Sequence, residues 1–137
     1  MSSVTSFEQL EIWQQARELA KAVRGLTRKY PFCKDFRFVS QFNSAAGSVM
    51  DNVAEGFERD GNREFIQFLY ISKGSVGEVR SQCYRAVDAE FIDPEEQLEI
   101  LKLTSSLKFK IQGLIQVLRN SGGKGYKSWS VKKIVEC

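Results

Sequence analysis

The sequence predicts an all-α protein, an antiparallel up-down-up-down bundle of four helices. Apolar residues recur at helical spacing in four long segments, and strand-like alternation is almost absent. Only two prolines occur in 137 residues, and 42% of the residues are apolar, which suffices for the core of one domain. Short turns separate the segments, as in simple bundles. We therefore expect helices over residues 8–30, 37–57, 63–91 and 94–120, and a tail at 121–137.

The first predicted helix carries an apolar face and, beside it, a row of cations. The expected core residues are Trp13, Ala16, Leu19, Ala20, Val23, Leu26 and Tyr30. Next to them, Arg17, Lys21, Arg24 and Arg28 fall within an arc of about 60°. We call these four residues the basic ridge. It is either an ordinary solvated face or a surface that binds phosphates, since only Glu11 and Glu18 lie nearby to neutralise it.

The second predicted helix follows Asp35, a suitable N-cap. Its apolar arc alternates large and small side chains: Phe42, Ala46, Val49, Met50, Val53, Ala54 and Phe57. The rest of its surface is polar but mostly short, as at Ser44 and Ser48, where a solvated helix would carry lysines and glutamates. This pattern indicates a helix with neighbours on more than one side.

The third predicted helix has two stripes, and Asn62 is its expected cap. The core stripe is Phe65, Phe68, Leu69, Ser72, Val76, Val79, Cys83, Ala86 and Val87. A second stripe, which we call the glycine stripe, comprises Ile66, Tyr70, Gly74, Gly77, Ser81 and Tyr84. Each mid-helix glycine costs about 1 kcal/mol relative to alanine. The two glycines therefore serve either a close helix crossing within the chain or a contact with another subunit.

The fourth predicted helix begins at Asp93-Pro94, a cap followed by a proline at the first helical position. Its seam is Ile100, Thr104, Leu107, Ile111, Leu114 and Leu118. The tail then interleaves basic and aromatic residues: Lys124, Lys127, Trp129, Lys132 and Lys133. Such a tail can stack on bases and contact phosphates, but it can equally be an unstructured end or a strap docked on the bundle.

Composition argues against catalysis. The chain contains no histidine, which removes the commonest general base and most zinc chemistry. Cys33, Cys83 and Cys137 form no CxxC pair and are expected to be reduced thiols. No secretory signal or membrane-spanning run is evident, so we expect a cytoplasmic protein without metal or cofactor. Residues 1–120 hold 16 Lys+Arg and 16 Asp+Glu, so the tail supplies the whole net charge of +3.

Several motifs, in order along residues 7–120, resemble one family. They include Phe7-Glu-Gln-Leu-Glu-Ile-Trp13 and Asn52-Val-Ala-Glu-Gly56 with Arg59 and Glu78. The chain is similar to four-helix-bundle proteins first noticed as products of intervening sequences in bacterial large-subunit ribosomal RNA genes. The accessory variability proteins of diversity-generating retroelements belong to the same group. The resemblance assigns structural roles to the motif residues Trp13, Asn52, Glu55, Gly56, Arg59 and Glu78.

The resemblance implies a ring-like homopentamer and, in the retroelement branch, binding to RNA or another nucleic acid and to a reverse transcriptase. It implies no catalytic residue. Two departures bear on these expectations. Asn43 and Ser44 stand where family members commonly carry arginine, which removes positive charge from the second helix. Val49-Met50-Asp51 replaces a proline-containing segment, so we expect that helix to be straighter.

Three functions follow from these observations. The first is a non-enzymatic, oligomeric RNA-binding accessory protein that uses the basic ridge and the tail. The alternative is an oligomeric scaffold that uses the glycine stripe and binds no nucleic acid. An enzyme is the least favoured, because the polar candidates are only Glu55, Arg59 and Glu78. Salt bridges between helices, or bonds that satisfy neighbouring polar groups, are the more ordinary roles for such residues.

Overall fold

The computed structural model describes residues 4–121 and confirms the all-α prediction. A short 3-10 helix, η1 (Phe7–Gln9), precedes α1 (Glu11–Thr27). A second one, η2 (Phe32–Lys34), leads into α2 (Phe36–Glu58). Helices α3 (Asn62–Asp88) and α4 (Pro94–Arg119) complete the described chain, which contains no strand. No helix between residues 4 and 121 is long and apolar enough to cross a lipid bilayer.

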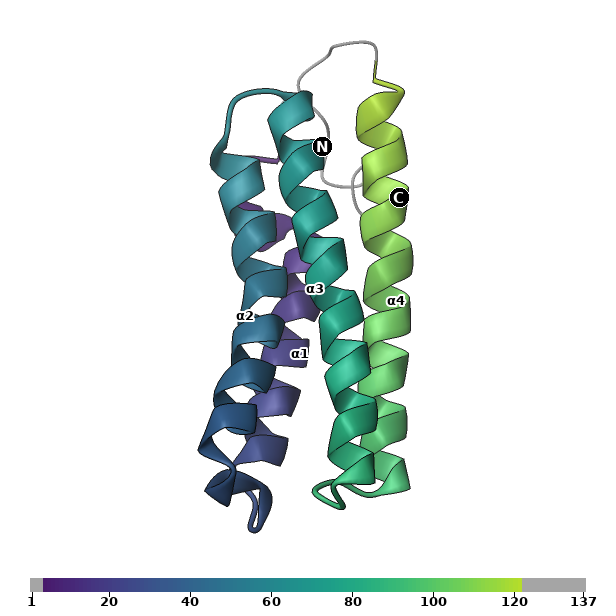
Figure 1. Cartoon of the computed structure of the whole chain (residues 1–137). Helices are drawn as coiled ribbons and strands as arrows, with labels where there is room; N and C mark the ends of the chain where they lie inside the picture. Colours follow the sequence, from purple (N-terminus) through teal and green to yellow (C-terminus); the bar gives the residue numbers. More distant parts are fainter. Residues whose placement is uncertain (1–3, 122–137) are drawn as a thin grey trace.

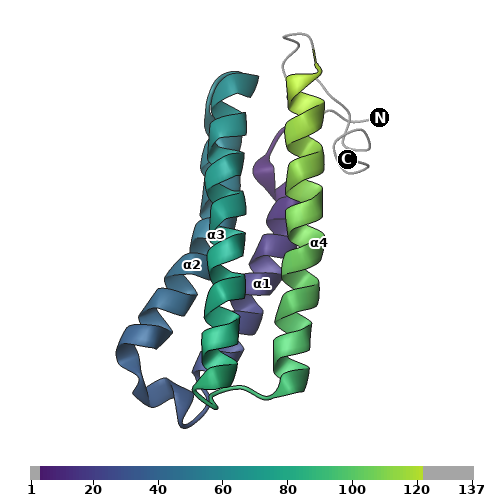
Figure 2. The same cartoon turned by 45° about the vertical axis from the view of Figure 1, so that its right-hand side comes forward.

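The four helices run antiparallel to their sequence neighbours (Figures 1 and 2). The α1–α2 and α3–α4 turns lie at one end of the bundle, and the α2–α3 turn lies at the other. Helix α2 packs against α1 and α3, while α4 packs against α3 and α1. The helices therefore follow one another around the bundle in chain order. Of the other three α-helices, α2 packs against only α1 and α3, and no described helix covers its outward face.

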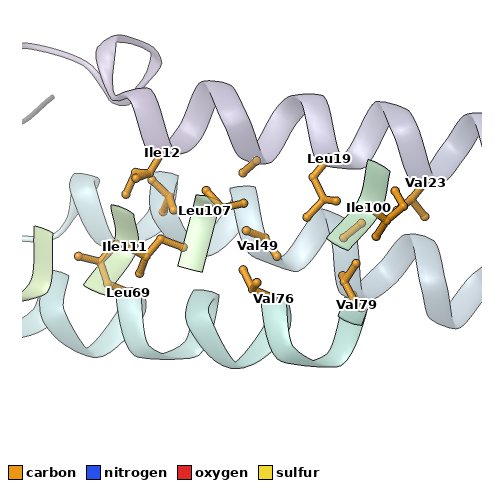
Figure 3. Packing of buried hydrophobic residues seen from close by; sticks show 14 of the residues in the cluster. Ile12, Leu19, Val23, Val49, Leu69, Val76, Val79, Ile100, Leu107 and Ile111 are labelled. Atoms are coloured by element: carbon orange, nitrogen blue, oxygen red, sulfur yellow. The ribbon is translucent and has the colours of Figure 1, made fainter. Parts of the chain in front are cut away.

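The core is apolar and receives side chains from all four helices (Figure 3). Leu19 and Val23 from α1 face Val49 from α2 and Val76 from α3, and Leu107 comes from α4. All five side chains are completely buried. Burying apolar area at about 25 cal/mol per Å² is the main force that holds such helices together.

Two of the three predicted caps are confirmed. The Asp35 carboxylate accepts a hydrogen bond from the Phe38 amide (3.1 Å). Asp93 and Glu96 form a reciprocal capping box at the start of α4. The prediction for Asn62 is wrong, because Gly61 caps α3 and Asn62 is already helical. The Asn62 amide instead donates to the Leu118 carbonyl (3.4 Å), which ties the start of α3 to the end of α4.

The helix boundaries differ most from expectation around the α1–α2 turn. Helix α1 ends at Thr27, three residues before the expected end, and Tyr30 is 79% exposed rather than part of the core. Phe32 takes the core position and is fully buried. Its ring lies 4.7 Å from that of Phe91 and 5.0 Å from that of Phe38. A turn residue therefore closes this end of the bundle.

Gly56 is expected to tolerate no side chain. A Cβ at this position would lie 2.6 Å from the Phe68 Cβ and 3.0 Å from the Phe65 ring, so α2 and α3 would have to separate. We expect Gly56→Ala to lower the free energy of unfolding by about 1–3 kcal/mol, as overpacking does. Gly47→Ala is the matched control in the same helix, because a Cβ there meets nothing within 4 Å.

The control should raise stability by up to about 1 kcal/mol through helix propensity. Urea denaturation of both variants provides the measurement. Equal shifts of the two midpoints in the same direction would contradict the close approach of α2 and α3 at Gly56.

Candidate nucleic-acid interface

The basic ridge lies along the exposed side of α1 that faces α2. All four of its residues are exposed. They line a groove of about 450 Å³ whose remaining walls are Ala20, Gly25, Asn43 and Gly47. From Arg17 to Arg28 the helix rises roughly 17 Å at 1.5 Å per residue. The ridge is therefore an extended line of cations beside a shallow channel.

The ridge is only lightly neutralised. Lys21 approaches Glu18 at 3.6 Å, but both side chains are more than half exposed, and such pairs contribute little. The Arg17 guanidinium lies 5.8 Å from the centre of the Trp13 ring, and no acidic side chain between residues 4 and 121 pairs with it. Arg24 and Arg28 form no ion pair with any residue between 4 and 121. The ridge is thus a positive surface on a bundle whose overall charge is balanced.

The channel widens over α2 because the side chains there are short. A groove of about 680 Å³ extends from Arg24 across Ser40, Ser44, Gly47 and Ser48. Asp51 is the one carboxylate that lines it. The absence of large side chains on this face of α2 keeps the floor low beside the ridge.

Asn43 belongs to the floor of this channel. Its amide nitrogen donates to the Thr27 hydroxyl and to the Val39 carbonyl, both at 2.9 Å. Asn43 is therefore used to join α1 and α2, and Ser44 beside it is exposed. The one cation that lines this part of the channel, Arg24, therefore comes from α1.

A third groove lies on the opposite flank of α2, against α3. It measures about 450 Å³ and is lined by Ser40, Gln41, Ser44, Ala45, Ser48, Glu78, Gln82 and Arg85. Because it shares Ser40, Ser44 and Ser48 with the groove beside the ridge, the two form one polar surface over α2. Hydrogen bonds from Ser72 to the Val49 carbonyl (2.7 Å) and between Ser48 and Ser75 (2.8 Å) hold α2 against α3 below it.

Gln82 is the residue of this surface that sequence reasoning missed. Its side chain is 5% exposed, and its Oε1 has no hydrogen-bond partner within the described residues. The available signal was a glutamine three residues after Val79 and four before Ala86, on the core side of the helix. A buried amide without a partner is costly and invites explanation.

The motif residues have mainly structural contacts. Trp13 packs edge-to-face on Phe7, with ring centroids 5.1 Å apart. The Asn52 amide donates to the carbonyl (2.8 Å) and the hydroxyl (2.9 Å) of Ser48, one turn earlier. These bonds stabilise the α2 backbone below the polar surface.

The expected salt bridges between helices are not found at the acidic motif residues. Glu55 pairs with Arg59 (3.1 Å), which lies one turn further along the same segment. The Arg59 guanidinium also lies 5.1 Å from the Phe68 ring centre. Glu78 is exposed, lines the α2–α3 groove and forms no ion pair within residues 4–121. Its carboxylate is therefore available at the surface.

The glycine stripe does not serve a helix crossing between the described helices. A Cβ at Gly74 or Gly77 would meet no atom of another helix in residues 4–121 within 4 Å, so that interpretation is wrong. Both glycines line a groove of about 510 Å³ together with Tyr70, Lys73, Arg80 and Lys108. Tyr84 is 50% exposed, and Ser81 is exposed as well. The stripe is an open strip of backbone flanked by tyrosines.

We expect the glycine stripe to form a subunit contact, and bulk there should disrupt assembly without harming the bundle. The double variant Gly74→Gln and Gly77→Gln should move the mass measured by light scattering towards the 15.6 kDa monomer. The control is Gly25→Gln with Gly47→Gln, two other helical glycines with open space. A monomeric wild-type protein, or an unchanged assembly in the stripe variant, would contradict the contact.

Among the described residues, two side chains, Cys83 and Lys29, have a perturbed pKa, and in neither case does the shift make the group more reactive at neutral pH. Burial raises the pKa of the Cys83 thiol to about 11, so the sulfur is protonated at neutral pH and packs as part of the core. The Glu96 carboxylate raises the pKa of Lys29 by hydrogen bonding at 2.6 Å, which joins the two turns at that end of the bundle. Between residues 4 and 121, no three Cys, Asp or Glu side chains are grouped to hold a metal ion.

The tail residues named above, Lys124, Lys127, Trp129, Lys132 and Lys133, lie outside the described residues. The candidate interface therefore consists of the basic ridge and the polar surface of α2 with its flank on α3. The elements that position it are α1, α2 and α3.

Comparison with known proteins identifies a solved structure with the same fold and the family of the chain. A solved protein of unknown function from the S23 ribosomal protein family of Bacteroides thetaiotaomicron has the same fold, with a TM-score of 0.70. It is 17% identical in sequence, and the match covers 77% of this chain and 98% of that one. A search of curated proteins found no match. The sequence matches the family of 23S rRNA-intervening sequence proteins over residues 8–113, and the chain belongs to that family.

Proposed function

We propose that this protein is a non-enzymatic RNA-binding accessory protein that acts as a homo-oligomer, with a ring-like homopentamer as its assembly. The observation that carries the proposal is the basic ridge, whose Arg24 and Arg28 have no ion-pair partner among the described residues. The ridge borders an open channel, so phosphates can reach it without displacing protein side chains. The family name, which refers to 23S rRNA, supports RNA as the partner.

The charge distribution suits a phosphate-binding site that is weak in one subunit and repeated in each subunit of the oligomer. Roughly 17 Å of ridge faces only a few phosphates of a nucleic acid strand. Because the body of the subunit is neutral, long-range attraction is modest and the contact depends on the ridge itself. Several ridges on one assembly raise the overall affinity through effective concentration, without any new contact. Oligomerisation is therefore part of the proposed mechanism.

In this proposal another chain performs the chemistry in the cytoplasm. The resemblance to accessory variability proteins suggests a reverse transcriptase as that partner. The test is co-expression of the full chain with the reverse transcriptase of a diversity-generating retroelement, followed by purification of the complex with and without nuclease. If neither the enzyme nor RNA is recovered with the chain, the proposal that a reverse transcriptase is its partner is overturned.

The scaffold alternative has one specific observation in its favour. Tyr70, Ile71 and Tyr84 on α3 are exposed apolar side chains, each between 38% and 52% accessible. Such a surface suits a protein partner as well as a second subunit. The scaffold predicts that the oligomer captures protein and that its affinity for RNA is negligible at all salt concentrations.

The direct test of the proposed function is binding of a structured RNA by the full chain across a salt series. Affinity should fall as salt rises, because neutralised phosphates release counterions. Reversing the charge of the ridge should abolish most of that binding. RNA binding that is absent at low salt, or that is indifferent to the ridge, would overturn the proposal.

A further inference from the structure

We propose that the groove between α2 and α3 receives the base of one unpaired nucleotide of the RNA, and that Gln82 and Glu78 read its hydrogen-bond donors. We call this the Gln82 groove. The inference rests on the proposed function, because the basic ridge holds the neighbouring phosphates. It assigns to this chain a preference for guanine.

The first observation is the state of Gln82. Its Oε1 is buried and has no partner between residues 4 and 121, and Gln82 is one of the residues that line an open groove. Part of the hydrogen-bonding capacity of the amide is therefore unused, and a ligand in the groove reaches Oε1 when the terminal amide turns towards it. A ligand that donates a hydrogen bond there would satisfy an atom that the protein leaves unsatisfied. Specific recognition relies on buried polar groups of this kind.

The second observation is the chemistry of the groove walls. Glu78, Gln82 and Arg85 follow at spacings of four and three residues and so share one face of α3. Glu78 is exposed without an ion-pair partner in the described chain and offers two acceptor oxygens. The guanidinium of Arg85 lies 4.6 Å from the centre of the Phe38 ring, which orients its donors. The groove thus presents acceptors and a donor side by side.

This arrangement matches the Watson–Crick edge of guanine. Guanine carries two neighbouring donors, at N1 and N2, and one acceptor, at O6. The donors fit the Glu78 carboxylate and the Gln82 Oε1, and O6 fits the Arg85 guanidinium. Uracil has one donor between two acceptors and would face the carboxylate with an acceptor. Single-stranded RNA is read on this edge, because its bases are unpaired.

The third observation is the path between the two sites. The ridge groove and the groove over α2 share Arg24, Asn43 and Gly47, and the latter shares three serines with the Gln82 groove. The intervening surface is low, because Ser44 and Ser48 have short side chains. A nucleotide can therefore lie across α2 with its phosphate at α1 and its base at α3. The Gln82 groove measures about 450 Å³, within the range of sites for small ligands.

The experiment compares short single-stranded RNAs on the full chain. The probes are a uridine decamer with one central guanosine, the same strand with inosine there, and the all-uridine strand. We expect the guanosine strand to bind about tenfold more tightly than the all-uridine strand, as one well-matched base contact allows. Inosine lacks the N2 amine and should retain only part of that preference.

Gln82→Met replaces the amide by an apolar side chain of similar size and should bring binding of the guanosine strand down to that of the all-uridine strand. Glu78→Gln changes an exposed residue, so folding is not at risk, and it should reduce the same preference. The double variant Arg24→Ala and Arg28→Ala should weaken all three strands alike and leave their ratio unchanged. The two sites thus give separate readouts.

The outcomes separate this inference from the proposed function. If both α3 variants keep the guanosine preference, or if the wild type has none, the inference is overturned while RNA binding stands. If no strand binds the wild type, the proposed function fails and takes the inference with it. If the α3 variants alter the mass of the assembly and leave base preference untouched, a second copy of the chain covers the groove, which also overturns the inference.

Discussion

Replacing Phe32 by alanine is expected to lower the free energy of unfolding by about 3–5 kcal/mol, the range for a fully buried phenylalanine. Phe32 is 0% exposed, and its ring lies between 4.7 and 6.1 Å from the rings of Phe38, Phe42 and Phe91. Its removal leaves a cavity where the α1–α2 turn meets the end of α3. The loss is large because three separate segments contribute to the cluster.

Phe36→Ala is the matched control for Phe32→Ala. It removes the same side chain from the same turn, but Phe36 is 77% exposed. Its effect should stay within about 0.5 kcal/mol. Urea denaturation followed by circular dichroism measures both variants. A loss of similar size at the two positions would show that Phe32 does not close the core as described.

Reversing the basic ridge is expected to have the largest effect on function. Changing Arg17, Lys21, Arg24 and Arg28 together to glutamate should weaken binding of a structured RNA by at least about a hundredfold at low salt. The slope of log affinity against log salt should become shallower by about three to four, because four phosphate contacts are lost at about 0.7–0.9 each. All four side chains are exposed, so the bundle should remain folded. Filter binding over a salt series measures both quantities.

A matched pair of double variants separates the ridge from net charge. Arg24→Glu with Arg28→Glu changes the charge by the same amount as Arg63→Glu with Lys102→Glu, and all four positions are exposed. Only the first pair should reduce binding strongly. Equal losses for the two pairs would show that RNA responds to overall charge, and the ridge would then have no special role.

Much of the fold could be predicted because its signals are local. Helical periodicity marks four helices, and the Asp93-Pro94 start of α4 is a cap that needs only its own backbone. The basic ridge could be predicted for the same reason, since residues on one face of one helix are related by 100° steps. The prediction for Asn62 was wrong because Gly61, at φ +90°, ends the turn one residue earlier and is itself the N-cap of α3.

Other features depend on partners that are distant in the sequence. Tyr30 and Phe32 are both aromatic residues near the end of α1, and periodicity favours Tyr30 for the core. The structure exposes Tyr30 and buries Phe32, because only the second can reach Phe91 after the chain reverses. The sequence likewise could not show whether the glycine stripe is exposed, because that depends on where the other helices lie around α3.

By itself, the sequence determined a four-helix protein without histidine, with cations in a row on its first helix. Only the tertiary structure decided that α2, with its short polar side chains, would lie beside that row and leave it open. It also decided that the Gln82 Oε1 would be buried without a partner in residues 4–121 while Glu78, one turn earlier, remained exposed. The physical reason is that a groove, and the desolvation of a side chain within it, are properties of two packed helices together.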